Sequence, residues 1–341
     1  MIIYITFFFL AIAPVVISRG FGYKNNIYAI IFASIIPLLF SSLRGDVGTD
    51  TIAYKTYYEQ LGLSVVGANF EPTFFILSLI GNFIGLNSQY LIVTVAMLQF
   101  VATILVISKV KEKDVLYFVI LTTFFVYINM NLIRAGTALY FTGLAYLYLM
   151  DEKVQKSWIV FFAGCVTHIS SFILAPAFFR KTYVLVPASV VALYMGYEFS
   201  TQKIANYTGN YGAFVQFSGG IGFFVVSSIL YYIVVNQFRK DKELIIVITF
   251  ATIIKFLSFF IPILDRFSTI FYFIGYLRMC YFGFNEKNRI LVYILCAYGL
   301  YGTLLFISTS DDAMYYLLID QPGLAELYKD TRWLPYRFFW Q

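Results

Sequence analysis

The residue types with the greatest chemical potential gather in one short stretch, from Arg44 to Asp50. It holds one cation, Arg44, two carboxylates, Asp46 and Asp50, and the glycines Gly45 and Gly48. Carboxylates at this spacing share one side of a helix, where they can act as a general base or hold a metal ion. Capping of the following helix is the commoner role for Asp50. Because the stretch directly follows a membrane-length apolar segment, it indicates a site for a polar ligand.

The sequence offers two further candidates for a catalytic base, His168 and Glu71. His168 is the single histidine of the chain and lies inside the apolar run 158–179, while Glu71 directly precedes the apolar run 72–86. A lone histidine is commonly a hydrogen-bonded core residue. At membrane depth, however, an ionisable group is a functional candidate, and an imidazole that titrates near neutrality can take a proton from a hydroxyl nucleophile.

Four cations are candidates for binding an anion, namely Arg44, Arg134, Arg266 and Lys255. The arginines lie at the outward ends of apolar segments, against the usual bias of positive charge, and a guanidinium binds phosphate oxygens in a bidentate way. A pyrophosphate ligand fits such a set. The alternatives are contact with lipid headgroups and, for Arg266, an ion pair with Asp265. Lys255 lies within the apolar run 244–264, so we expect it to face a cavity or to pair with a carboxylate.

The composition excludes a soluble protein. Hydrophobic residues make up 60% of the 341 residues and charged residues 12%, whereas soluble domains carry about 25% charged residues. The sequence predicts an all-α, polytopic integral membrane protein with about 10–12 transmembrane or re-entrant helices in a single domain, residues 1–341. Its predicted spans are 2–17, 27–43, 90–108, 115–129, 135–150, 158–179, 183–198, 219–236, 244–264, 267–280 and 290–308, with a shorter apolar run at 72–86.

The basic residues set the orientation of these spans. Six short connectors carry them, and the positive-inside rule places such connectors in the cytoplasm. The net charge of +6 therefore reports topology, and we expect no nucleic-acid partner. The outward polar segments are then the loops 44–71 and 199–218 and the tail 311–341. The basic pairs and triplets are Arg19 and Lys24; Lys109, Lys111 and Lys113; Lys153 and Lys156; Arg180 and Lys181; Arg239, Lys240 and Lys242; Lys287 and Arg289.

Strict alternation of these sides fails in two places. Glu71 is predicted outside and Lys109 inside, so one crossing should separate them, but two apolar runs do. Lys156 and Arg180 are both predicted inside, so no crossing or two crossings should separate them, but one apolar run does. The mismatch disappears if 72–86 and the halves flanking His168 are short or broken helices. Because irregular backbone at membrane depth lines a protein-walled or aqueous cavity, this places Glu71 and His168 beside the Arg44–Asp50 stretch. The alternative is that one basic cluster does not lie in the cytoplasm.

Several motifs are spread along the chain. They are Leu43-Arg44-Gly45-Asp46-Val47-Gly48-Thr49-Asp50 with Tyr54, Glu71-Pro72, Asn131-Leu132-Ile133-Arg134, His168-Ile169-Ser170-Ser171, Asp265-Arg266-Phe267 and Leu334-Pro335-Tyr336-Arg337-Phe338-Phe339-Trp340. Together they resemble the EpsG family of Wzy-type polysaccharide polymerases, which includes O-antigen polymerases.

The resemblance implies a glycosyltransferase-C-like membrane enzyme at the outer face of the bacterial inner membrane. Its substrates would be undecaprenyl-pyrophosphate-linked oligosaccharides. A growing glycan would pass from its lipid pyrophosphate to a sugar hydroxyl of an incoming repeat unit, in contact with the bilayer and with a flippase and a chain-length regulator as partners. The cations named above would bind pyrophosphate, and Asp50, Glu71 or His168 would be the base. Tyr54, Tyr57, Tyr58 and Asp46 would hold sugars.

No cofactor and no metal site are expected, because one histidine and unclustered cysteines do not form a zinc site and arginines can stabilise the leaving group. Two other functions stay open from the residues alone. A lipid-linked oligosaccharide flippase or other transporter would also need a cationic cavity and broken helices, although its gates would lie on both faces. A glycan acyltransferase would also use a histidine at membrane depth, but nothing else in the sequence calls for an acyl donor.

Overall fold

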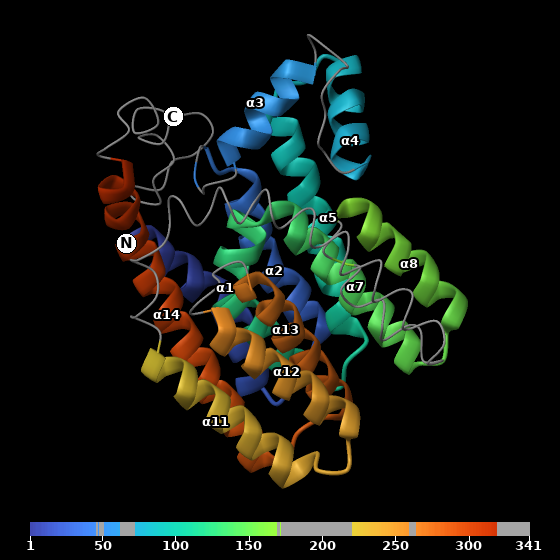
Figure 1. Ribbon diagram of the computed structural model, residues 1–341, viewed down its shortest axis with the longest axis vertical. Coiled ribbons are helices and arrows are strands. Elements are labelled where there is room, and N and C mark those ends of the chain that lie inside the picture. The colour runs from blue at the N-terminus through green and yellow to red at the C-terminus, as the bar shows by residue number, and fades with distance from the viewer. Residues whose placement is uncertain are drawn as a thin grey trace.

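The computed structural model describes residues 1–45, 47, 51–61, 72–168, 171, 220–258 and 264–318. Its regular elements are helices, which confirms the all-α prediction for these ranges (Figure 1). They are α1 (Ile2–Gly20), α2 (Ile27–Ser42), α3 (Thr51–Leu61), α4 (Pro72–Phe83), α5 (Gln89–Ser108), α6 (Lys113–Val119), η1 (Ile120–Asn131), α7 (Ile133–Met150), α8 (Val154–Thr167), α11 (Gly220–Gln237), α12 (Lys242–Ser258), α13 (Leu264–Phe282) and α14 (Glu286–Leu318).

The exterior of this bundle is apolar, as a lipid environment requires. Among the described residues, α1, α5 and the Glu286–Ser308 part of α14 are long and apolar enough to cross a membrane, and four other apolar helices are shorter. Large apolar side chains face outward along these helices, for example Phe9 on α1 and Val101 on α5. Soluble proteins rarely expose apolar surface on this scale, so the chain is an integral membrane protein.

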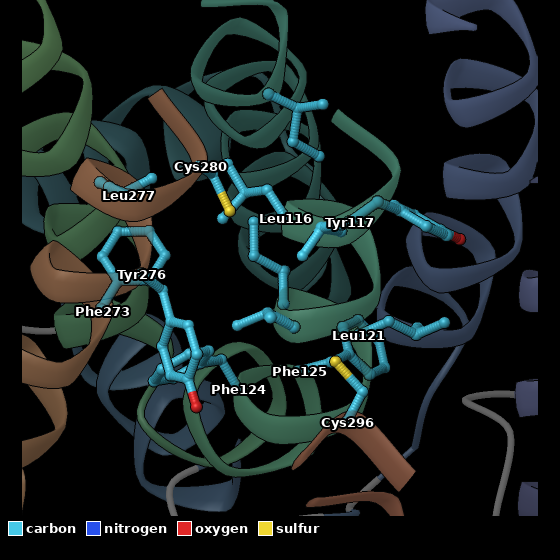
Figure 2. Close-up of a cluster of buried hydrophobic side chains, with 14 of the residues drawn as sticks. Leu116, Tyr117, Leu121, Phe124, Phe125, Phe273, Tyr276, Leu277, Cys280 and Cys296 are labelled. Carbon is cyan, nitrogen blue, oxygen red and sulfur yellow. The ribbon is translucent and has the colours of Figure 1, made fainter. Parts of the chain in front are cut away.

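The centre of the bundle is the continuous run of α6 and η1. Beyond Lys113 and Asp114 at its start, this run is predominantly apolar, as expected of a helix surrounded by others, and it packs against α2, α5, α7, α13 and α14. Figure 2 shows Phe124 beside Tyr276 of α13 and Leu121 near Cys296 of α14, whereas Tyr117 points the other way. Its hydroxyl donates to the Ala11 carbonyl of α1 at 2.8 Å. The buried cysteines Cys280 and Cys296 lie in this core, and Cys165 is also buried.

The backbone of η1 is a π-helix over 12 residues, where the sequence predicts one ordinary span. π-Helices usually occur as single turns within α-helices and are frequent at functional sites. A glycine permits the close packing here, because a Cβ on Gly136 of α7 would lie 2.8 Å from the carbonyl oxygen of Ile128 and 2.6 Å from its Cγ2. The structure therefore places an unusual backbone directly before the segment that carries Arg134.

Ion pairs join the connectors at one end of the bundle. Arg19, in the last turn of α1, donates to the Tyr293 hydroxyl and lies 4.0 Å from the Asp114 carboxylate, which accepts from the Asn25 backbone N–H at 2.9 Å. Next to it, Arg289 of α14 binds both carboxylate oxygens of Glu112, at 2.6 and 3.1 Å. These contacts hold the α1–α2, α5–α6 and α13–α14 connectors together.

The α7–α8 connector joins the same end through Asp151. This carboxylate lies 3.3 Å from the Lys109 ammonium and 3.6 Å from that of Lys153, and it accepts from the Tyr281 hydroxyl at 2.9 Å. Burial raises its pKa, but the Tyr281 hydroxyl and the two lysines outweigh burial, so the pKa of Asp151 is lowered.

Arg278 of α13 brings in the α11–α12 connector. Its guanidinium lies 2.7 Å from Asp241 and 2.5 Å from Glu243, and it donates to the Tyr146 hydroxyl at 2.6 Å. We call the contacts made by Arg19, Glu112, Asp114, Asp151, Asp241, Arg278 and Arg289 the basic collar. Five of the six predicted cytoplasmic connectors meet in it, which supports the predicted common side. The sixth, at Arg180 and Lys181, lies outside the described residues.

The predicted helix breaks agree with the described backbone. The helix α4 is short and starts at Pro72, since proline fits the first helical position, and α8 stops at Thr167. His168 ends α8 in an extended conformation, with φ −159° and ψ 132°. The second half of the run 158–179 lies outside the described residues beyond Ser171. At the other end of the chain α14 continues to Leu318, past the predicted end of the span at 308 and into the predicted tail.

Candidate functional site

The best-defined part of the candidate site is Arg134, in the first turn of α7, together with Tyr54 of α3. The Arg134 Nε donates to the Tyr54 hydroxyl at 3.0 Å, and the guanidinium carbon lies 5.3 Å from the centre of the same ring. Tyr54 stacks on Phe74 of α4, with ring centres 5.7 Å apart. Arg134 is half-buried, so its guanidinium is held in place but keeps an accessible side. Such a cation can receive a phosphate oxygen.

A second contact brings the start of α4 to the end of α8. The hydroxyls of Thr73 and Thr167 lie 3.3 Å apart, so the helix that follows Glu71 begins beside His168. The His168 backbone N–H donates to the Gly164 carbonyl at 2.9 Å, and its carbonyl accepts from the Ser171 N–H at 3.1 Å. These bonds fix the backbone at His168, whose side chain is half-buried. One set of contacts thus runs from Arg134 through α3 and α4 to the histidine.

Arg44 lies deeper than the sequence indicates. Its side chain is 1% exposed, and its Nη1 donates to the Met130 carbonyl oxygen in η1 at 2.6 Å. The amide of Gln89, at the start of α5, donates from Nε2 to the carbonyls of Arg44 at 3.1 Å and Ser42 at 2.7 Å. The guanidinium is therefore directed at backbone within the protein, next to the segment that leads to Arg134.

The three tyrosines predicted to hold sugars have different surroundings. Tyr54 supports Arg134, as described. Tyr57 is half-buried, and burial raises the pKa of its phenol while the positive charge of nearby Arg134 opposes that rise. Tyr58 is 2% exposed and donates its hydroxyl to the Leu86 carbonyl at 2.8 Å. This placement favours a packing role for Tyr58, and the sugar contact predicted for it stays a prediction.

The remaining predicted site residues are not brought to this point by the described contacts. Lys255 lies half-buried in the last turn of α12, which packs on α13 and α11. Arg266 belongs to the first turn of α13, and its side chain is outside the described residues, as are Asp46, Asp50 and Glu71. The helix expected to follow Asp50 is present as α3, but whether Asp50 caps it is not described.

Several residues near the candidate site were not predicted from the sequence. Thr73 and Thr167 join α4 to α8, and Gln89 and Gln99 hold the ends of α2 and α7 through backbone carbonyls. Gln99 carried a signal, because a side-chain amide inside the membrane-length apolar run 90–108 needs hydrogen-bond partners. The threonines carried none, since a hydroxyl within a helix can bond its own backbone.

No cluster of three or more histidine, cysteine, aspartate or glutamate side chains occurs within the part of the chain that the structure describes. The described contacts link the Arg134 guanidinium to the phenols of α3 and, through Thr73 and Thr167, to the end of α8 that carries the His168 imidazole. A guanidinium can neutralise an anionic leaving group, an imidazole can accept a proton, and phenols can contact a polar ligand through ring and hydroxyl.

The fold and the site define a class, namely polytopic helical membrane proteins with a polar site at the end opposite their basic connectors. Within that class, a model of the EpsG family matches residues 27–321. The chain therefore belongs to the EpsG family, which is linked to exopolysaccharide biosynthesis. No curated protein and no solved structure matches the chain, so the predicted likeness to type C glycosyltransferases rests on the sequence alone.

Proposed function

We propose that this protein is a Wzy-type polysaccharide polymerase. It joins repeat units of an O-antigen, capsule or exopolysaccharide that are carried on undecaprenyl pyrophosphate. The proposal places it in the bacterial inner membrane, with the site on the periplasmic or outer side and a flippase and a chain-length regulator as partners. Family membership supports this proposal, since it links the chain to exopolysaccharide biosynthesis. The geometry of Arg134 supports it more specifically.

The observation that carries the proposal is the contact path between Arg134 and His168. The path leads from Arg134 to Tyr54, across the stacked ring of Phe74 into α4, and from Thr73 to Thr167 at the end of α8. It joins a cation suited to an anionic leaving group with a base suited to a hydroxyl nucleophile. Both lie at the ends of helices remote from the basic collar (Figure 1).

In the proposed reaction, a sugar hydroxyl of the incoming unit attacks the anomeric carbon of the growing glycan. The new glycosidic bond forms as the bond from that carbon to the pyrophosphate oxygen breaks, and undecaprenyl pyrophosphate leaves. The hydroxyl proton passes to His168, Asp50 or Glu71. Arg134 meets the charge that develops on the leaving pyrophosphate, and Arg266 and Lys255 are further candidates for that charge. Tyr57 and Asp46 are candidates for holding the sugars.

The test uses the purified protein and a defined lipid-linked repeat unit, with and without a chelator. We expect a ladder of products that survives the chelator. Arg134→Ala and His168→Ala should each lower the rate by about 100-fold or more while the protein still inserts, by analogy with the loss of one electrostatic group or one base. A normal ladder from both variants would contradict the assigned roles. Transbilayer movement of the unit without any ladder would favour a flippase.

A further inference from the structure

We infer that Arg44 is a positioning residue, which fixes the joint between η1 and α7 and thereby holds Arg134 at the site. The inference rests on the proposed function for the role of Arg134. It changes the role of Arg44 from a direct pyrophosphate ligand to a group that acts through another residue. The joint consists of Met130, Asn131, Leu132 and Ile133, and we call it the η1–α7 joint.

The first support is where the Arg44 guanidinium points. Carbonyl groups in the last turn of a helix lack donors within that helix, and Met130 lies in the last turn of η1. Arg44 supplies a donor from outside, with Nη1 2.6 Å from the Met130 oxygen. A charged donor at this distance makes a strong hydrogen bond. A side chain that is 1% exposed has little surface left for a ligand.

The second support is that Arg44 is itself held from α5. Gln89 donates to the carbonyls of Ser42 and Arg44, which ties the end of α2 to the start of α5. The first residue of α5 therefore fixes the backbone from which the Arg44 side chain extends. Because the amide of Gln89 is buried, these bonds are shielded from competing water.

The third support is a second amide of α5 on the same joint. Gln99 donates from Nε2 to the Ile133 carbonyl at 3.1 Å, and Ile133 directly precedes Arg134. The Tyr140 hydroxyl donates to the Asn129 side-chain oxygen at 2.7 Å, which holds η1 against α7. The joint is thus fixed on both sides, by Arg44 at Met130 and by Gln99 at Ile133, and Arg134 is the first charged residue after it.

The contrast between the two arginines completes the argument. Arg134 is half-buried and lies on the face of an aromatic ring next to another phenol, whereas Arg44 is 1% exposed and donates to the Met130 backbone carbonyl. Removal of Arg44 would leave the Met130 carbonyl without this donor and free the joint to shift. The direction of the Arg134 side chain depends on that joint, so the effect would reach the site without any contact between Arg44 and substrate.

The test measures the position of residue 134 in protein free of substrate. Arg134→Cys is introduced into a background in which Cys165, Cys280 and Cys296 are replaced by alanine, and its reaction rate with a water-soluble anionic thiol reagent is measured. Adding Arg44→Met should change this rate by about threefold or more, because the joint then samples open states. Arg289→Met is the matched control. It removes a partly buried arginine from the basic collar, at the other end of the bundle, and should leave the labelling rate of residue 134 unchanged.

A change below about threefold with Arg44→Met would overturn the inference. If Arg44→Met fails to insert, Arg44→Gln serves in its place with the same threshold. Activity gives an independent arm, because Arg44→Met and Gln99→Met act on one joint and the double variant should lose no more than the worse single variant. If the activity losses of the two single variants multiply in the double variant, Arg44 acts independently of the η1–α7 joint. Failure of the wild-type protein to polymerise would sink the proposed function but not the labelling result.

Discussion

Residue type alone did not separate two arginines that the structure separates clearly. Arg44 and Arg134 have the same side chain and flank neighbouring outward helix ends, yet one donates to a backbone carbonyl within the protein and the other rests on Tyr54. The difference is one of depth and of partner. A guanidinium always seeks acceptors, and only the fold decides whether a ligand or the backbone supplies them.

Tyr54 and Tyr58 offer a matched test of this difference, since both are buried tyrosines of α3. Tyr54→Phe removes the oxygen that accepts from Arg134 but keeps the stacked ring, so kcat/KM for polymer formation should fall about tenfold, the effect of one charged hydrogen bond. Tyr58→Phe removes the donor to Leu86 and should lower the unfolding temperature at nearly unchanged kcat/KM. A large loss of kcat/KM in Tyr58→Phe at normal stability would restore the predicted sugar contact.

Two aspartates of the basic collar should respond to pH in opposite ways. Burial raises the pKa of Asp114 above its ordinary value of 3.8. The Asn25 N–H and the Arg19 charge lower this pKa, but by less than burial raises it. Its stabilising effect is thus fully present below about pH 3.8 and lost as the pH rises through the raised pKa. The pKa of Asp151 is lowered, so its contribution is present above about pH 3.8 and lost as the pH falls through the lowered value.

The measurement is the unfolding temperature of wild type, Asp114→Asn and Asp151→Asn between about pH 7 and about pH 2.5, a range that extends below the ordinary pKa of 3.8. As the pH falls, the wild type should gain stability relative to Asp114→Asn and lose stability relative to Asp151→Asn. Each variant controls for the other, because both remove one carboxylate from the same end of the bundle. Parallel pH profiles for the two variants would contradict the opposite pKa shifts.

At the scale of elements, the close packing of the π-helix η1 against α7 depends on Gly136 of α7. A Cβ at Gly136 would lie 2.8 Å from the Ile128 carbonyl oxygen, which is backbone and cannot rotate away. A Cβ at Gly143 of the same helix would meet only the ends of the Leu277 and Phe273 side chains, at 2.8 Å. An alanine at position 136 would therefore have to displace backbone, whereas an alanine at position 143 would have to displace only side-chain ends.

Gly136→Ala should therefore destabilise the protein by about 1–3 kcal/mol, the usual effect of overpacking, and Gly143→Ala by less. Unfolding temperatures in the same detergent decide this. Since η1 leads into the joint before Arg134, Gly136→Ala should also reduce polymer formation more than Gly143→Ala does. Equal effects of the two alanines on both measurements would argue against the special packing at η1.

Hydropathy and charge predicted most elements because lipid imposes simple demands. The spans of α1, α2, α5, α7 and α11 follow directly from apolar runs, and the breaks at Pro72 and His168 followed from counting membrane crossings between basic connectors. The π-helical backbone of η1 was not predictable, since the same apolar residues fit either helix and packing selects one. The burial of Arg44 was equally hidden, because it depends on Met130, far away in sequence.

At the scale of the whole molecule, the two ends of the bundle differ in how they are held together. The basic collar joins connectors through charged hydrogen bonds, while the opposite end is joined by aromatic stacking, hydroxyl contacts and amide-to-backbone bonds. The predicted orientation places the collar in the cytoplasm. The α4–α5 turn then lies outside, and the α11–α12 turn inside.

Labelling of intact cells tests this orientation. Asn87→Cys, in the exposed α4–α5 turn, should react with a membrane-impermeant thiol reagent in intact cells. Lys240→Cys, in the equally exposed α11–α12 turn, should react only after permeabilisation. The native cysteines are buried and give little background. Labelling of Lys240→Cys in intact cells would reverse the orientation and move the site to the cytoplasm.

The length of α14 has a geometric consequence for the outer surface. A helix of 33 residues measures about 50 Å at 1.5 Å per residue, and the bilayer core is about 30 Å thick. Even at a tilt of about 40°, the upper end of the usual range, it would span about 38 Å along the membrane normal. With its start at the basic collar, α14 must therefore extend beyond the lipid at its other end, so the bundle presents a continuous helix to the water on the side of the candidate site.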